Sequence, residues 1–139
     1  MKRNQEEHLI QCGIVDWYNR VIGDELLMAI PNGGARSVVT GAMLKREGVR
    51  SGVWDLFLPV PMCTKDGEIA ECGLWIEVKI PKVRNHARGG CSEKQEKFGQ
   101  TMRRRGYSTV IVYTTEEGIS AIRRYLSNSL TAETSNSKI

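Results

Sequence analysis

Apolar side chains recur at every third or fourth position near the start of the chain. These positions are Ile10, Ile14, Trp17 and Val21. The spacing is typical of an amphipathic helix with one buried face, and it predicts a helix over residues 5–22. Three further helices are predicted over residues 38–47, 92–105 and 115–130, where glycines and a serine stand at typical helix boundaries.

Shorter apolar runs lie between these helices and predict four strands. They cover residues 26–30, 55–60, 74–80 and 107–114. The last run, YSTVIVYT, is rich in β-branched side chains, which favour strands. Asp66 and Gly67 form a turn signal between the second and third strands, so we expect a hairpin there. The alternation of strands and helices predicts a small α/β domain, with a mixed sheet covered by helices.

Breaker residues and polar runs separate these elements. Residues 31–34 predict a loop after the first strand, and the polar, glycine-rich residues 81–91 predict another. A chain of 139 residues fits one domain with one core, which we assign to residues 1–130. Residues 131–139 are polar and are expected to form a disordered tail.

Composition and charge limit the kinds of partner and the cellular compartment that we expect for this protein. The net charge of +4 favours anionic partners, although it is a weak signal alone. The four cysteines form no C-x-x-C pair and only two histidines are present, so we expect no zinc site and reduced thiols. No apolar run approaches the ~18 residues of a membrane span, and no signal-type segment follows the N-terminus. These features predict an intracellular, cytoplasmic protein.

Charged residues interrupt the two central strands. Asp55 begins one strand, and Glu77 and Lys79 share a face of the next, because side chains alternate along a strand. If the strands pair, Asp55 lies beside Glu77, and two poorly solvated carboxylates repel each other unless a cation lies between them. Oxygen ligands favour magnesium or manganese. The alternative is a surface ion pair between Lys79 and one of the acids.

The stretches GVWD and IEVK, which contain these residues, look like the PD-(D/E)XK nuclease signature. The wider chain resembles the VRR-NUC family of that superfamily over residues 7–126. The segments that carry the resemblance are EEHLIQCGIVDWY, IPNGGARS, KREGVRSGVWDLFLPVP, LWIEVK and SEKQEKFGQTMRRRGYSTVIVY. The resemblance implies a restriction-endonuclease-like α/β fold and Mg²⁺- or Mn²⁺-dependent hydrolysis of DNA phosphodiesters. Small stand-alone members are typical of bacteriophages, act on branched or Holliday-junction DNA and form homodimers; a phage-encoded protein would work in the host cytoplasm.

The resemblance also implies roles for individual residues. Asp55 and Glu77 would bind the metal, with the main-chain carbonyl of Val78. Lys79 would position the attacking water or stabilise charge on the phosphate. Trp54 departs from the family pattern, which often has proline before the metal-binding aspartate. Because proline there shapes a turn and does no chemistry, we expect activity to survive with a locally different backbone.

Two further residues are assigned to the site with their alternatives. Glu7 follows the apolar face of the first helix and matches a family glutamate near the metal; Glu6 is its competitor, and both are favourable charges in a first helical turn. Gln95 follows Ser92 by three residues, which is a complete capping box. The family places a glutamine near the active site, and both roles are compatible.

Basic residues and an Asn-Gly-Gly segment are predicted to contact DNA phosphates. They are Asn32, Gly33, Gly34, Arg36, Lys45, Arg46, Arg50, Lys82, Arg84 and Arg88. For Lys82, Arg84 and Arg88 the alternative is a solvated loop, and for Asn32, Gly33 and Gly34 it is a turn. The leading hypothesis is a metal-dependent endodeoxyribonuclease that uses direct water attack and prefers branched DNA. The alternative is a catalytically inactive nucleic-acid-binding module on the same fold.

Overall fold

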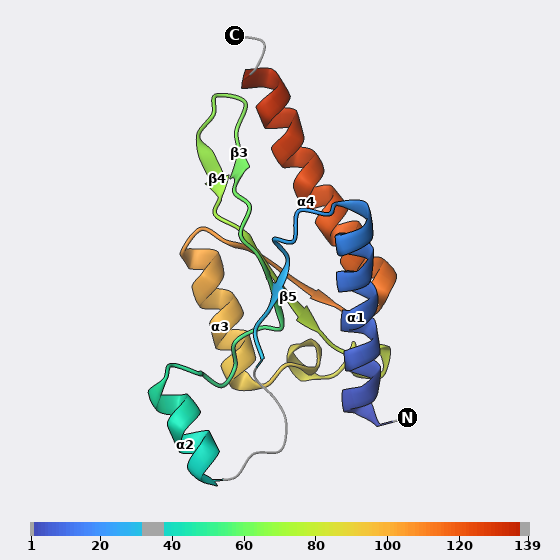
Figure 1. Ribbon diagram of the computed structural model, residues 1–139, viewed down its shortest axis with the longest axis vertical. Helices are drawn as coiled ribbons and strands as arrows, with labels where there is room; N and C mark the ends of the chain where they lie inside the picture. The colour runs from blue at the N-terminus through green and yellow to red at the C-terminus, as the bar shows by residue number, and fades with distance from the viewer. Residues whose placement is uncertain (1, 32–37, 137–139) are drawn as a thin grey trace.

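A four-stranded mixed sheet forms the centre of the molecule (Figure 1). The computed structural model describes residues 2–31 and 38–136, with side chains up to residue 128. The strands lie in the order β1 (Met28–Ala29), β2 (Leu56–Leu58), β5 (Leu74–Val78) and β6 (Ser108–Val112). β2 is antiparallel to both β1 and β5, whereas β5 and β6 are parallel. The predicted α/β class with a mixed sheet is confirmed.

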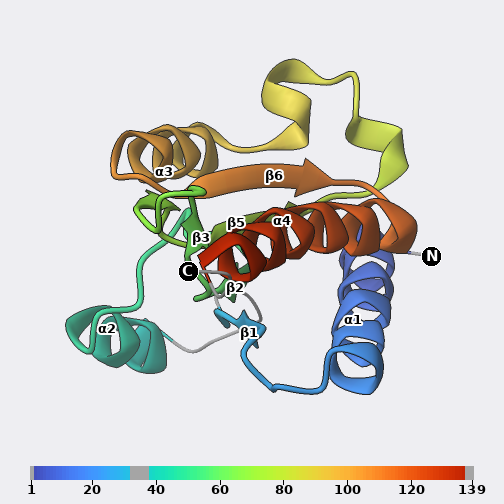
Figure 2. The same ribbon diagram turned by 90° about the horizontal axis from the view of Figure 1, so that it is seen from above.

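Helices cover both faces of this sheet (Figure 2). Helices α1 (Arg3–Val21) and α4 (Thr115–Asn136) pack together on one face, and α3 (Glu93–Arg104) lies on the other. Helix α2 (Val38–Arg46) stands apart and contributes no buried residue. No helix among residues 2–31 and 38–136 is long and apolar enough to cross a membrane.

The main core lies between the sheet and the pair α1–α4. Ile14, Leu56, Ile76 and Ile122 are completely buried there. Ile14 and the buried Trp17 agree with the face predicted for the first helix, whereas Val21, predicted on the same face, is 52% exposed. Tyr18 is also fully buried, and its hydroxyl donates a hydrogen bond of 2.6 Å to Asp24. That bond satisfies a polar group that burial would otherwise leave without a partner.

Three predictions of local structure need correction. The turn at Asp66 and Gly67 does not join β2 to β5; it closes a separate small sheet of β3 (Met62–Cys63) and β4 (Ile69–Glu71). The predicted loop 81–91 contains two short 3₁₀ helices, η1 (Pro81–Val83) and η2 (Ala87–Gly90). Helix α4 continues to Asn136 and does not end near residue 130. The division into a domain and a tail is not tested by these features and stays a prediction.

Two helical glycines make a matched test of the packing between α1 and α4. A Cβ at Gly118 would meet the buried Ile14 side chain, whereas a Cβ at Gly41 would meet nothing within 4 Å. Gly118→Ala should therefore lower the free energy of unfolding by about 1–3 kcal/mol. Gly41→Ala should raise it by about 0.5–1 kcal/mol, because alanine favours a helix. Urea denaturation measures both, and equal effects would contradict the packing.

Candidate active site

The pairing of β2 with β5 brings the predicted acids together. Leu56 lies opposite Ile76 in the antiparallel register, so the preceding Asp55 lies opposite Glu77. Asp55 Oδ2 accepts a hydrogen bond of 2.8 Å from the main-chain N–H of Val78. A cleft of about 330 Å³ opens here, lined by Glu7, Ser51, Gly52, Val53, Asp55, Glu77, Lys79, Ser92 and Gln95.

Glu77 is the most deeply buried member of this group, with 1% of its surface exposed. Its Oε1 atom lies 3.2 Å from Lys79 Nζ and accepts a hydrogen bond of 2.8 Å from Gln95 Nε2. Its Oε2 atom is buried and has no hydrogen-bond partner among the described residues. A buried carboxylate oxygen without a partner is costly and calls for an explanation.

Both carboxyl groups have raised pKa values in this environment, so their neutral forms are favoured. Burial, and then the charge of Asp55, raise the pKa of Glu77 from 4.5 to about 8, although Lys79 opposes the shift. Burial also raises the pKa of Asp55 above its usual range, against the lowering effect of the Val78 N–H bond. A cation near both groups would favour their charged forms.

The residues present fit a hard divalent cation. Asp55 and Glu77 supply carboxylate oxygens, and one Glu77 oxygen is free of protein partners in the described structure. The N–H and C=O of a strand residue point to the same side, so the Val78 carbonyl faces the side of Asp55. No group of three or more His, Cys, Asp or Glu side chains in the described residues could hold a metal. Mg²⁺ usually keeps several waters and needs only one or two carboxylates.

The two competing glutamates of α1 occupy different places. Glu7 lines the cleft, and its charge contributes to the raised pKa of Asp55. Arg3 Nε lies 3.1 Å from Glu7 Oε1, while a second Arg3 nitrogen donates to the Gly90 carbonyl. Glu6 lines another pocket with Leu9 and Pro81. The structure therefore places Glu7 beside the acids.

Gln95 performs its capping role and reaches the site at the same time. Ser92 Oγ accepts from the Gln95 main-chain N–H at 3.1 Å, and Gln95 Oε1 accepts from the Ser92 N–H at 2.9 Å. The other end of the same amide, Nε2, donates to Glu77. The cap fixes the side chain of Gln95, and the fixed amide orients the carboxylate.

Sequence reasoning missed the role of Trp54 in placing α3. The indole Nε1 donates a hydrogen bond of 2.8 Å to the Gln95 carbonyl, and the ring is 3% exposed. Gly99 makes room for the ring, because a Cβ there would collide with it. The residue before Asp55 thus holds the helix that carries Gln95. Gly99, a glycine in the middle of a helix, shows that something packs closely there but does not identify Trp54 as the partner.

The predicted DNA-contacting residues are dispersed. Lys45, Arg46 and Arg50 are exposed, on α2 or between α2 and Asp55, and Lys82 is exposed in η1. The Arg84 guanidinium bonds Glu117 and lies over the Tyr113 ring, and Arg88 Nε donates to the Cys91 carbonyl. Neither arginine lines the cleft. Asn32, Gly33, Gly34 and Arg36 lie outside the described residues, so their role stays a prediction.

Comparison with known proteins supports the fold. A solved structure described as a VRR_NUC domain protein superposes with a TM-score of 0.69 and 21% sequence identity. The match covers 89% of this chain and 90% of that one. No family model matches the sequence, and no curated protein matches it at a significant level. The chain shares its fold, a mixed sheet flanked by helices, with this VRR_NUC domain protein.

The pKa of Glu77 leads to a prediction for metal-free protein. A carboxyl whose pKa rises from 4.5 to about 8 on folding binds more protons in the native state between these values. The free energy of unfolding therefore falls as the pH rises through that window. Thermal melts in EDTA should show this fall for the wild type and a shallower one for Glu77→Gln, whose amide cannot ionise. Parallel melting curves for the two proteins would show that Glu77 is not buried as a carboxyl.

Proposed function

We propose that this protein is a metal-dependent endodeoxyribonuclease that hydrolyses DNA phosphodiesters with bound Mg²⁺ or Mn²⁺. The observation that carries the proposal is the buried Glu77 Oε2, which has no partner among the described residues, beside Asp55 and Lys79. A pure binding module gains nothing from two clustered carboxylates, which would repel a phosphate backbone. The name of the structural neighbour, a VRR_NUC domain protein, agrees with a nuclease.

Asp55, Glu77 and the Val78 carbonyl would hold the metal ion. A bound divalent cation would polarise the phosphate and lower the pKa of a bound water. Lys79 is 6% exposed and reaches the same cleft, where its Nζ would donate to the attacking water or to an oxygen on which charge develops. Gln95 and Lys79 together fix one Glu77 oxygen, which leaves the other oxygen for the cation.

Glu7 lines the cleft from α1, and Arg3 forms an ion pair with it. Since Arg3 also bonds the Gly90 carbonyl, it ties the first helix to the segment that precedes Ser92 and Gln95. Glu7 would act on a water or on a ligand of the metal and would not coordinate the ion as a third clustered acid. This role agrees with the absence of a three-acid cluster from the described residues.

The preferred DNA would be branched, with a Holliday junction as one candidate. A domain of this size offers little surface for reading bases, and its exposed basic residues are spread over α2, the segment after it, η1, α3 and α4. Dispersed phosphate contacts position a backbone but carry no sequence information. A homodimer would present two clefts to two strands.

A cleavage assay with a matched pair of variants tests the proposal. Asp55→Asn should lower the rate on a labelled four-way junction at least about a hundredfold, because it removes a metal-binding charge, while DNA binding persists. Asp66→Asn is the control, since this exposed turn carboxylate lies on the other sheet. Flap and linear duplex, each with Mg²⁺, Mn²⁺ or EDTA, complete the comparison.

The outcomes separate the two hypotheses. Loss of cleavage in EDTA and in Asp55→Asn, with full activity in Asp66→Asn, supports the nuclease. Binding without cleavage under every metal would instead make the protein an inactive nucleic-acid-binding module. Thermal melts add a readout that does not need activity: Mn²⁺ at about 100 times its Kd should stabilise the wild type by about 2.7 kcal/mol, and Asp55→Asn much less.

A further inference from the structure

Within residues 2–31 and 38–136, the outer edge of strand β6 has no pairing partner, because the sheet ends there in the order β1-β2-β5-β6. Natural proteins usually blunt such edges with short strands, charges, prolines or bulges. The opposite edge strand, β1, spans only Met28–Ala29 and is followed closely by Pro31. By contrast, β6 reads STVIV, without a charge, a proline or a bulge.

The backbone of β6 is ready to pair on its outer side. The Ser108 N–H donates to Gly73, and the Val112 carbonyl accepts from Lys79, so these residues face β5. Alternation along the strand then turns the N–H and C=O groups of Thr109 and Ile111 outward. Four of the five residues of β6 are only partly buried, although the parallel partner β5 is buried along most of its length.

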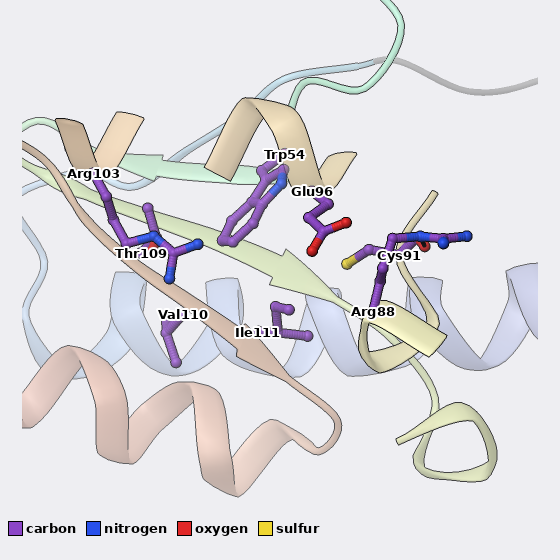
Figure 3. Close-up of a pocket in the computed structure, with 8 residues that line it drawn as sticks. All are labelled: Trp54, Arg88, Cys91, Glu96, Arg103, Thr109, Val110 and Ile111. Carbon is purple, nitrogen blue, oxygen red and sulfur yellow. Dashed lines mark hydrogen bonds between the residues drawn. The ribbon is translucent and has the colours of Figure 1, made fainter. Parts of the chain in front are cut away.

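Grooves run along this edge on both faces of the sheet. On the α4 side they are lined by β6 and by Glu116, Ser120, Ala121, Arg124 and Asn128. On the α3 side the groove contains Arg88, Glu96 and Arg103 beside Thr109 and Ile111, as Figure 3 shows. The strand edge is therefore flanked by helices but not covered by them.

The charges along the α4 groove have opposite signs at its two ends. Glu116, Ser120 and Arg124 follow one another at intervals of four residues, so they share a face of the helix. Among the described residues neither Glu116 nor Arg124 has an ion pair within the chain. Helix α4 runs in the opposite direction to β6. Glu116 therefore lies near Val112, and Arg124 lies nearer to Thr109.

We propose that two copies of this chain pair through the outer edges of β6, in antiparallel register about a two-fold axis at Val110. Thr109 of each copy would lie opposite Ile111 of the other and exchange both backbone hydrogen bonds with it. The same axis passes near Ser120 and places Arg124 of one copy against Glu116 of the other. An isologous interface needs this kind of self-complementary surface.

The charge pattern favours a second copy over an unrelated peptide strand. A foreign strand would satisfy the backbone groups but would not supply an acid and a base at the matching ends of α4. On the α3 side, Arg103 would meet Glu96 of the other copy. Arg88 lies near Glu96 and weakens that contact, so the α4 side determines the register.

The pairing has a consequence for the proposed nuclease. A two-fold axis normal to a continuous sheet keeps both α3 helices on the same face. The candidate clefts would then open on one side of the joint sheet and at its opposite ends, which suits two strands of one branched substrate. The interface itself requires neither metal nor DNA, so its test is independent of the proposed activity.

Light scattering after size-exclusion chromatography, over a range of protein concentrations, tests the interface. The wild type should elute at twice the chain mass of 15.6 kDa. Arg124→Glu should raise the dimer Kd at least about tenfold, because like charges then meet at both symmetric contacts. The double variant Glu116→Arg with Arg124→Glu should recover the wild-type Kd. Arg20→Glu reverses an exposed charge on α1 and should change nothing.

A backbone variant provides a second line of evidence. Ile111→Pro removes an outward N–H that takes no part in the β5 ladder, and it should give a monomer with an unchanged circular dichroism spectrum. If it fails to fold, the charge-swap series decides the question. A monomeric wild type, a dimer indifferent to Arg124→Glu, a folded but still dimeric Ile111→Pro, or a double variant that stays weak would each overturn the proposal.

Discussion

The antiparallel register of β2 and β5 is the constraint on which the candidate site depends. Leu56 and Ile76 are packed opposite each other in the core, and this contact fixes Asp55 against Glu77. A slip of one residue would turn the acids toward the apolar face. The acids lie on the opposite face of the sheet from these two side chains, toward α3, and burial there is the main cause of their raised pKa values. The pairing of β2 with β5 therefore determines both the packing of the core and the position of the two acids.

A second layer of contacts converts these two acids into an oriented site. Trp54 anchors the Gln95 backbone, and the Ser92 hydroxyl caps the helix by accepting from the Gln95 N–H. The Gln95 side chain accepts from the Ser92 N–H, and its amide nitrogen donates to Glu77. Together these contacts connect the start of β2, α3 and β5. A tryptophan beside Asp55 is thus compatible with the candidate site, since its ring packs against Gly99 and stabilises the helix that supplies the amide.

Sequence patterns predicted the helices and strands that have a clear apolar periodicity. They did not predict which segments pair with one another in the folded protein. The apolar spacing of the first helix and the β-branched run of β6 identified both elements, and the alternation in LWIEVKI placed Glu77 and Lys79 on one face. The Asp66–Gly67 turn was assigned to the wrong strands, because a turn signal does not specify which segments pair beyond it. The bond between Trp54 and Gln95 joins residues 41 positions apart, a contact that no local pattern encodes. The contacts of Arg84 with Glu117 and Tyr113 could not be predicted for the same reason.

Asp55, partly buried just before β2, and the buried Glu77 of β5 are proposed to form a site for a hard cation. Diffraction from a crystal soaked in Mn²⁺, recorded near the manganese absorption edge, tests this central claim most directly. The account predicts an anomalous peak in contact with Asp55, Glu77 and the Val78 carbonyl. A soaked crystal with no peak at that position, or with manganese bound only elsewhere, would contradict it.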